Sequence, residues 1–464
     1  MRKLRTLLIL IFLSIHVIEA QTIEVDVGNV VKDFDYRPLG LNLNYLVDDD
    51  TYLNPDIRLS SSLNSMKVGM LRYPGGEKSD NYLWSVSPYN SSNPHFATSG
   101  NCNWPNSDAR FSNNFTTPLS STMDFDEFMV ISNSIGATPL IVVAADAHHN
   151  SFCDNPPSLQ DLITNAVEWV RYANVEKGYN IKYWMIGNES WNSAAYDEPS
   201  TATEYANDFI QFATAMKAID SSISIVANSQ EGQWAETLVD LASEHVDIIA
   251  ISNYPVYQWN DGYDRYLNGN PSFIQNIESI RNTIGEKDIG IIVSEYNAID
   301  WSAAWPSNND LGRALVNFQM FGDQIRIPEV EGAFFWNSRW VDNDTSPQSL
   351  FDAIDANGQL NASGKALSLW GNHFLDKLVQ SSNSGTINSF ATVDHTANEL
   401  NIFLINKDYR EKEVNVNISN FPHLFLDSLA ISELVFTGNS IDDQFPTIDT
   451  PEDHLIFENS ELRV

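Results

Sequence analysis

The chain has 464 residues, of which 43% are hydrophobic and 11% aromatic, so it can bury a large core and is not a wholly disordered protein. It carries 26 Lys and Arg against 61 Asp and Glu, which gives a formal net charge of −35. A surface this acidic repels phosphate groups, which argues against nucleic-acid binding and against adsorption on anionic membranes.

The first twenty residues have the pattern of an export signal. Basic residues at positions 2, 3 and 5 precede an apolar run over 7–18, and the small residue Ala20 comes before Gln21. A membrane anchor is the weaker alternative, because the apolar run is too short to span a bilayer comfortably. We therefore predict cleavage after Ala20 and a secreted or periplasmic protein that is not inserted in a membrane.

The mature chain opens with an alternating strand over 22–27, after which short apolar runs alternate with longer amphipathic stretches. The predicted strands are Leu39–Asn44, Val68–Tyr73, Thr138–Ala144, Tyr183–Gly187, Ile223–Ala227, Asp247–Ser252, Gly290–Ser294 and Gly332–Trp336. The predicted helices are Asp124–Ile135, Ser158–Asn174, Thr203–Asp220, Glu231–Glu244, Pro271–Ile284 and Leu311–Arg326. Continuous apolar strands separated by helices indicate a parallel sheet with both faces covered, and eight such units predict a (β/α)8 barrel. A doubly wound sheet is the alternative, but its glycine-rich phosphate-binding fingerprint is absent.

Beyond Leu378 the strands become short and alternating, with no helix-length pattern between them. The segments are Gly385–Val393, Glu399–Ile405, Glu413–Ile418 and Ala430–Phe436. They predict an antiparallel β-sandwich domain, which we expect the N-terminal strand to join because its backbone groups need a partner. The predicted division is a signal peptide (1–20), the N-terminal strand (21–36), the barrel (37–377) and the β-sandwich domain (378–464).

A long polar segment over Pro74–Met123 follows the second barrel strand. On a barrel it would project from the C-terminal face, where active sites lie, so we interpret it as a loop that shapes the substrate site. Cys102 and Cys153 both lie in polar, loop-like segments, and a disulfide between them is plausible in an exported chain.

Two glutamates lie at the C-terminal ends of predicted barrel strands. Glu189 follows the fourth strand in the string Gly187-Asn188-Glu189, and Glu295 follows the seventh strand in Ser294-Glu295-Tyr296-Asn297. A single strand-end Glu is most often a salt-bridge partner or lies beside a helix cap. Two that face one barrel mouth are what glycosidic-bond cleavage needs, one protonated and one ionised. We therefore predict that both are catalytic.

Three further residues at strand ends fit the same interpretation. Arg72 is predicted to pair with Glu295 and to hold its pKa low, although a structural Arg that closes the barrel mouth is the alternative. Asn188 is predicted to donate to a sugar 2-hydroxyl. Tyr254 ends the sixth strand and is predicted to lie beside Glu295, although an ordinary core tyrosine is nearly as good an interpretation.

Aromatic side chains at strand ends and in loops are candidates for sugar binding, because flat rings pack on the apolar faces of sugars. The predicted substrate-binding tryptophans are Trp191, Trp259, Trp301 and Trp336. Trp84, Trp305 and Trp340 are further loop candidates, whereas Trp169 and Trp184 are expected in the core.

Asp146, His148 and His149 follow the third strand and raise the question of a metal site. Adjacent His residues on a strand would point in different directions, and no H-E-x-x-H motif is present. We therefore predict no metal. There is also no G-x-S-x-G elbow of a serine hydrolase.

Taken together, the motifs resemble the clan A retaining glycoside hydrolases, and within them the branch that holds families 39, 51, 79 and 86. The residues that carry the resemblance are Arg72-Tyr73-Pro74-Gly75-Gly76, Gly187-Asn188-Glu189, Ser294-Glu295-Tyr296-Asn297 and the segment from Phe125 to Asn174. The resemblance implies that Glu189 is the acid/base and Glu295 the nucleophile of a double displacement with retention, without a cofactor. It also implies that Asn188 contacts the 2-hydroxyl and that Arg72 supports Glu295.

The expected partner is a polysaccharide or its oligosaccharides. Arabinofuranosidase-like members of the clan often carry His near the end of the sixth strand, where this chain has Asn253 and Tyr254. Export and the strongly acidic surface suit a polysaccharide degrader, and our first expectation is a galactan such as agar or porphyran. The alternatives are an exo-acting hydrolase of the arabinofuranosidase, xylosidase or glucuronidase type, and a barrel that binds carbohydrate without catalysis. An exported metallohydrolase is a weaker alternative.

Overall fold

The computed structural model describes most of the chain after the predicted signal. The described residues are 21–45, 55–85, 88–89, 97–98, 123–149, 156–192, 199–306, 308–339, 352–422, 431–451, 456–458 and 461–463. The predicted export signal, the pair Cys102 and Cys153, Trp340 and most of the loop over Pro74–Met123 lie outside them. Within the described residues, no helix combines the length and apolar character needed to cross a membrane.

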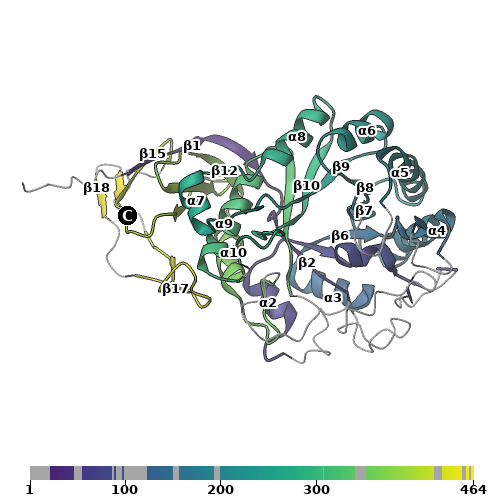
Figure 1. Ribbon diagram of the computed structural model, residues 1–464, viewed down its shortest axis with the longest axis horizontal. Helices are drawn as coiled ribbons and strands as arrows, with labels where there is room; N and C mark the ends of the chain where they lie inside the picture. The colour runs from purple at the N-terminus through teal and green to yellow at the C-terminus, as the bar shows by residue number, and fades with distance from the viewer. Residues whose placement is uncertain are drawn as a thin grey trace, which may run out of the picture.

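Eight parallel strands close into a barrel, as the sequence predicted (Figure 1). In chain order they are β2 (Leu39–Asn42), β3 (Met70–Tyr73), β6 (Thr138–Val143), β7 (Tyr183–Ile186), β8 (Ser224–Asn228), β9 (Ile248–Asn253), β10 (Gly290–Tyr296) and β11 (Val330–Phe335). The barrel closes between β11 and β2, where Ala333 is paired with Leu39 and Phe335 with Leu41. Each predicted strand is found to within a few residues at its ends.

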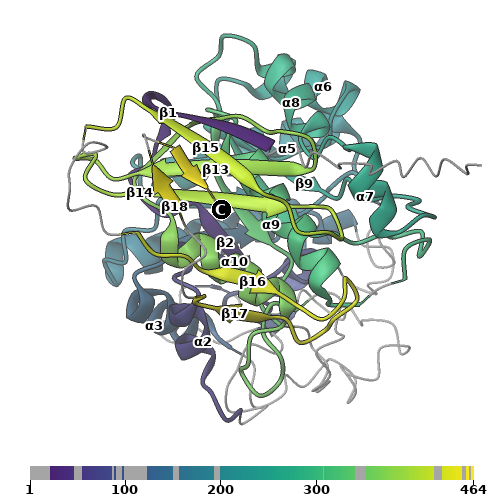
Figure 2. The same cartoon turned by 90° about the vertical axis from the view of Figure 1, so that its left-hand side faces the viewer.

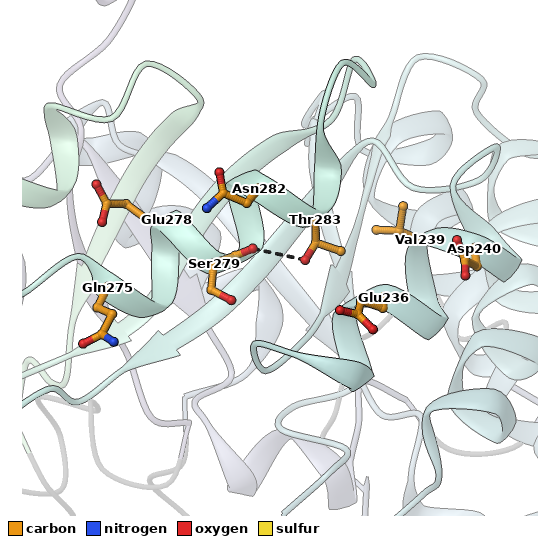
Figure 3. A pocket seen from close by; sticks show the side chains of 8 residues that line it. All are labelled: Glu236, Val239, Asp240, Gln275, Glu278, Ser279, Asn282 and Thr283. Carbon is orange, nitrogen blue, oxygen red and sulfur yellow. Dashed lines mark hydrogen bonds between the residues drawn. The ribbon is translucent and has the colours of Figure 1, made fainter.

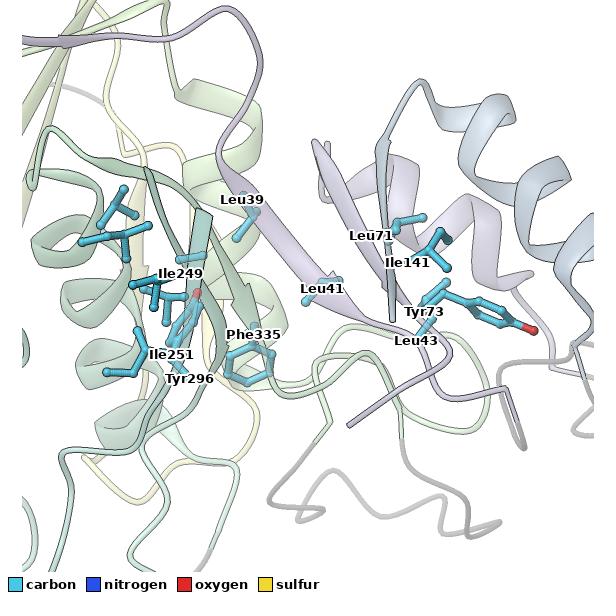
Figure 4. Packing of buried hydrophobic residues seen from close by; sticks show 14 of the residues in the cluster. Leu39, Leu41, Leu43, Leu71, Tyr73, Ile141, Ile249, Ile251, Tyr296 and Phe335 are labelled. Carbon is cyan, nitrogen blue, oxygen red and sulfur yellow. The ribbon is translucent and has the colours of Figure 1, made fainter. Parts of the chain in front are cut away.

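Side chains alternate between the two faces of the barrel wall. Those facing outward join a large core against the helices, and Figure 4 shows part of it, including Leu39, Leu41, Ile249, Ile251 and Phe335. Those facing inward form a separate cluster, which consists of Met70, Leu140, Val142, Tyr183, Met185, Val226, Ile248, Ala250, Ile292 and Phe334. This interior is tightly filled, since a Cβ on Gly40 would lie 2.6 Å from the ring of Phe334.

Helices surround the barrel (Figure 1). They are α2 (Leu59–Ser65), α3 (Phe125–Ile135), α4 (Leu159–Val170), α5 (Ala202–Lys217), α6 (Gln233–Ala242), α7 (Tyr263–Gly269), α8 (Gln275–Ile284), α9 (Leu311–Ile325) and α10 (Ala362–His373). α4 continues into the π-helical turn η4 (Arg171–Glu176). α2, α7 and α10 are not among the helices named from the sequence. The last contains Gly364 and Gly371, which lower helix propensity, but a side chain at either would overlap a neighbouring backbone carbonyl.

A second, seven-stranded sheet lies beside the barrel (Figure 2), in the order β14-β13-β12-β1-β15-β19-β18. Its strands are β1 (Gln21–Asp33), β12 (Lys377–Ser381), β13 (Ile387–Val393), β14 (Leu400–Asn406), β15 (Val414–Ser419), β18 (Ile456–Glu458) and β19 (Glu461–Arg463). β1 does join the C-terminal strands, antiparallel to β12 and parallel to β15. The sheet is thus antiparallel except at that one pair. β16 (Val435–Thr437) and β17 (Thr447–Asp449) form a separate hairpin.

The sheet packs on the barrel through α9 and α10. The ring of Phe390 on β13 lies against Gly322 of α9, and the guanidinium of Arg326 lies 4.2 Å from the centre of the same ring. Trp370 of α10 stacks on Phe403 of β14, with ring centres 4.2 Å apart. These contacts join the two parts of the chain through large apolar surfaces.

The substitution Gly322→Ala tests this interface. A Cβ at this position would overlap the Phe390 ring, so we expect a loss of about 1–3 kcal/mol and a lower unfolding temperature, although Ala normally stabilises a helix. The control is Gly269→Ala, where the nearest atom to the new Cβ is the flexible Arg265 side chain at 3.3 Å. Thermal unfolding followed by circular dichroism measures both. Equal unfolding temperatures for the two variants would contradict the tight contact.

Candidate active site

The two predicted catalytic glutamates line one cavity. Glu189 lies just after β7, and Glu295 is the next-to-last residue of β10. Both lie at the C-terminal mouth of the barrel. The cavity has a volume of about 640 Å³, and the described residues that line it include Asn188, Tyr254 and Trp336. The structure therefore brings together carboxylates that are far apart in the sequence.

An irregularity in β10 turns Glu295 into the cavity. Ile291 and Val293 belong to the outer core, so strict alternation would place residue 295 on the outer face as well. The register with β9 shifts between Val293, which pairs with Ile251, and Glu295, which pairs with Ser252. One extra residue therefore reverses the alternation, and Tyr296 returns to the outer core. The predicted strand ended at Ser294, so the sequence analysis did not foresee this bulge.

Glu189 lies on a tightly turned segment after β7. Its φ of 45° lies in the left-handed region, which is costly for a residue with a Cβ. The turn is stabilised at the next residue: the Ser190 N–H donates to Asn228 Oδ1 (2.9 Å) and its hydroxyl donates to Asp146 Oδ2 (2.7 Å). Gly187 has a φ of 70°, and a Cβ there would lie 2.7 Å from Asp146 Oδ2. These bonds hold Glu189 in place at the edge of the cavity.

Arg72 connects the two halves of the site. It is fully buried and donates to Glu295 Oε1 (2.9 Å), to Asn188 Oδ1 (2.6 Å) and to Asn42 Oδ1 (2.8 Å). Asn42 is itself oriented by donating to the Ser294 carbonyl at 3.0 Å. The predicted pairing of Arg72 with Glu295 is thus present, and the same guanidinium also orients Asn188.

Both oxygens of Glu295 are held by neutral or cationic donors. Tyr254 donates its hydroxyl to Glu295 Oε2 at 2.8 Å, while Arg72 occupies Oε1. Burial and the negative charges of Glu295 and Glu189 raise the pKa of Tyr254 well above its usual value, so it stays a donor. On the other glutamate, Asn192 donates to Glu189 Oε2 at 2.9 Å.

The net electrostatic effect on Glu295 is opposite to the one expected from Arg72 alone. Burial and the negative charge of Glu189 raise the pKa of Glu295 to about 7, although Arg72 and the hydrogen bond from Tyr254 act to lower it. The expectation of a low pKa is therefore wrong for the resting site. The Glu295 carboxyl group therefore retains a proton up to near neutral pH in the resting site.

The predicted tryptophans divide into two groups. Trp191, Trp301 and Trp336 line the cavity. Trp301 is 55% exposed and meets Tyr254 edge to face, so its ring is accessible to a ligand. Trp259 does not line the cavity: it is buried and stacks on Trp305, with ring centres 5.5 Å apart. A loop position did not reveal which ring would be buried away from the cavity.

Glycine at position 76 leaves room for this arrangement. A Cβ there would lie 2.6 Å from the ring of Trp336 and 2.7 Å from Glu295 Oε1. Gly76 therefore permits the segment after β3 to lie close to these two side chains, in addition to the tight turn expected at Gly75 and Gly76.

Several lining residues carried no signal in the sequence. They come from different strand ends and loops, and they are Glu77, Asp80, Gln230, Glu231 and Asn276. With Glu189 and Glu295 they make the cavity strongly acidic. Among the described residues that line it, none is Lys, Arg or His. A cavity of this charge disfavours anionic ligands.

A second hollow lies between α6 and α8, on the outside of the barrel (Figure 3). Its volume is about 660 Å³, and it is lined by polar side chains of the two helices, including Glu236, Glu278 and Asn282. Thr283 donates its hydroxyl to the Ser279 carbonyl at 3.1 Å, an ordinary bond within a helix. None of the strand-end groups described above reaches this hollow, so we assign it no chemistry.

The chain is similar to known proteins both in sequence and in fold. Residues 62–270 match the family model described as the alpha-L-arabinofuranosidase 1 domain. A family 51 alpha-L-arabinofuranosidase from Bifidobacterium longum, AbfB, superimposes with a TM-score of 0.72 at 15% identity, covering 96% of both chains. The resemblance to the clan A retaining glycoside hydrolases is confirmed. The matched segment contains Glu189 and ends before Glu295.

Three further proteins similar to this chain are also described as alpha-L-arabinofuranosidases. The alpha-L-arabinofuranosidase of Thermotoga maritima superimposes with a TM-score of 0.68 at 18% identity, covering 96% of this chain and 97% of that one. The intracellular exo-alpha-(1->5)-L-arabinofuranosidase of Acetivibrio thermocellus is 25% identical over 316 residues, which are 62% of this chain and 56% of the relative. Alpha-L-arabinofuranosidase C of Emericella nidulans is 28% identical over 190 residues, 37% of this chain. The match spans only 32% of the length of that fungal relative. The structural matches confirm the predicted barrel with its β-sandwich domain.

The first prediction from the site concerns pH. In Glu189→Gln the neighbouring negative charge is lost, so the pKa of Glu295 should fall from about 7 toward its ordinary 4.5. The acidic limb of the pH profile of kcat/KM should move to lower pH. It is measured with an aryl glycoside whose leaving group needs no protonation. Glu231→Gln is the control, because this lining carboxylate does not contribute to the shift of Glu295. An unmoved limb in Glu189→Gln would show that the two carboxyl groups are not coupled.

The second prediction concerns Tyr254. Tyr254→Phe removes a hydrogen bond to a carboxylate, worth about 1.5–3 kcal/mol, so kcat should fall roughly 10- to 100-fold. Because this bond lowers the pKa of Glu295, its loss should also move the acidic limb to higher pH. The exposed neighbour Tyr257 provides the control Tyr257→Phe, which should change neither quantity. A drop in kcat without the shift of the limb would mean that Tyr254 acts on the substrate alone.

Proposed function

We propose that this protein is a retaining glycoside hydrolase that removes α-L-arabinofuranosyl residues from neutral glycans. The observation that carries the proposal is the pair Glu189 and Glu295 in one cavity, with the buried Arg72 donating to Glu295 and to the residue before Glu189. Two carboxyl groups in one cavity, one of them paired with a buried guanidinium, are suited to glycosidic-bond cleavage.

In the proposed mechanism Glu295 attacks the anomeric carbon and forms a glycosyl-enzyme, while Glu189 protonates the leaving oxygen. The pair retains one proton near neutral pH, and the reactive form is the one in which Glu189 carries it. When Glu189 is neutral, its repulsion of Glu295 disappears and the donors Arg72 and Tyr254 favour the ionised nucleophile. Glu189 then takes a proton from a water molecule as the water oxygen attacks the anomeric carbon; the bond from that carbon to Glu295 breaks, and the sugar leaves with retained configuration.

Asn188 completes the proposed transition-state contacts. Arg72 holds its Oδ1 at 2.6 Å, which leaves the amide N–H groups as donors toward the cavity. A donor beside the acid/base is placed to bond a sugar 2-hydroxyl, an interaction that strengthens as the oxocarbenium ion forms. Tyr254 occupies the end of β9, whereas Asn253 turns away from the cavity and donates to the Phe273 carbonyl at 2.7 Å.

The choice of sugar has two supports. The family model and the relatives named above are described as alpha-L-arabinofuranosidases, and one of them as exo-acting. The acidic lining disfavours sulfated or uronic acid-rich chains, which would need basic groups in the cavity. Our first expectation of agar or porphyran therefore has no support, and the arabinofuranosidase alternative takes its place.

The test is a panel of 4-nitrophenyl α-L-arabinofuranoside, β-D-xylopyranoside and β-D-glucuronide, followed by arabinan, xylan, agar and porphyran. We expect turnover of the arabinofuranoside and release of free arabinose from arabinan. Glu295→Gly should lose about 10⁴-fold or more in kcat, as expected for loss of a catalytic nucleophile. Glu189→Ala should keep activity on the activated aryl substrate and be accelerated by azide, giving an arabinosyl azide of retained configuration.

Specific outcomes would contradict the proposal. An azide product of inverted configuration from Glu189→Ala would exchange the roles of the two glutamates. Hydrolysis undiminished in Glu295→Gly would remove that residue from the mechanism. Binding of glycans without turnover of any of them would favour the non-catalytic carbohydrate-binding barrel.

A further inference from the structure

Two adjacent histidines and an aspartate gather outside the cavity, at the C-terminal end of β6. His148 and His149 lie in the short helix η3 (Ala147–His149), and Asp208 lies on α5. His148 Nε2 is 3.2 Å and His149 Nε2 4.0 Å from the same oxygen, Asp208 Oδ2. One potential ligand atom from each residue lies within 4.8 Å of the other two. Among the described residues, this is the one group of three or more such side chains that is close enough to share an ion.

The local backbone explains why the two imidazoles lie together. From the sequence, His148 and His149 were expected in an extended segment, where neighbouring side chains point to opposite faces. The chain instead forms a 3₁₀ turn after β6, and the two rings lie side by side with centres 3.8 Å apart. The directions of the two imidazoles therefore do not exclude a metal site, contrary to the expectation from the sequence.

The orientation of His148 is that of a prepared ligand. Its Nδ1 lies 2.8 Å from the Ala145 carbonyl and must donate to it, so Nε2 is the ring nitrogen that faces Asp208 and is the atom available to coordinate an ion once it is deprotonated. In metal sites, the ring nitrogen of a histidine that does not bind the metal usually donates to a backbone carbonyl or a carboxylate in this way. The three side chains are only partly exposed, at 15%, 31% and 21%, which leaves one side open to solvent.

We propose that His148, His149 and Asp208 bind a divalent transition-metal ion such as Zn²⁺. Bonds of about 2.0–2.2 Å to a tetrahedral ion place ligand atoms roughly 3.3–3.5 Å apart. The 3.2 Å separation already fits this geometry, and the 4.0 Å separation needs a shift of well under 1 Å. Two imidazoles and one carboxylate suit zinc, with water completing the coordination on the open side.

The ion would act as a cross-link rather than as a catalyst. None of the three ligands lines the catalytic cavity. The ion would fasten the segment after β6 to α5, and Asp146 in that same segment accepts the Ser190 hydroxyl beside Glu189. Metal binding would thus stabilise the support of the acid/base without taking part in the reaction.

Zinc binding to the full mature chain tests the proposal. After dialysis against a chelator, titration calorimetry with ZnCl₂ should show one site per chain, and elemental analysis after desalting should find one zinc. His149→Gln and Asp208→Asn should each weaken binding roughly tenfold or more. The unfolding temperature should rise with zinc in the unmodified protein and not in Asp208→Asn.

The matched control is His395→Gln. His395 also lies near two carboxylates, Asp33 at 3.7 Å and Asp376 at 3.8 Å. These three side chains do not place one ligand atom each close enough together to share an ion. The His395→Gln variant should bind zinc with the same stoichiometry and affinity as the unmodified protein. No stoichiometric zinc, or equal binding by Asp208→Asn and His395→Gln, would show that the cluster is an ordinary His–Asp ion pair.

Discussion

The active site depends on one buried cation. Arg72 has no exposed surface, yet it carries a full charge at the mouth of the barrel. Removing such a charge from water is costly unless it is paired and hydrogen-bonded. Its partners come from three other strands: Asn42 from β2, Asn188 from the end of β7 and Glu295 from β10. The need to compensate this single charge therefore positions the groups that surround the proposed reaction centre.

Charge balance also explains why the pair of carboxyl groups retains a proton. With both glutamates ionised, the cluster of Arg72, Glu189 and Glu295 would carry a net negative charge in a buried setting. One proton on the pair makes the cluster neutral, in line with the raised pKa of Glu295. The same state supplies one acid and one nucleophile. In this way the desolvation that makes the site costly also prepares it for double displacement.

The site is held by residues that take no part in the chemistry. Glu189 adopts a left-handed backbone conformation, and it does so because the adjacent Ser190 is anchored to Asn228 and Asp146. Gly187 and Gly76 are required because side chains there would collide with Asp146 and with Glu295. Strain at a functional residue persists only where its surroundings determine it in this way.

Much of the architecture could be read from the chain. Eight apolar runs with helical patterns between them predicted the barrel, and the lone N-terminal strand was correctly expected to join the C-terminal sheet. The helix α10 was missed because its glycines and serines have low helix propensity, and tertiary packing overrides that preference. Trp259 and Trp301 look alike in the sequence, but one is stacked on Trp305 and the other is exposed in the cavity.

The sequence by itself determined which residues lie at the ends of the barrel strands, because an apolar run followed by polar groups marks where a buried strand ends. The tertiary structure alone decided which way those residues face. A strand alternates with period two, so Glu295 shares its parity with the outward-facing Ile291 and Val293. Only the extra residue in β10, which is set by pairing with β9, turns this carboxyl group inward to Arg72. Pairing between distant strands leaves no local signal, and for that reason the orientation of the proposed nucleophile could be known only from the folded barrel.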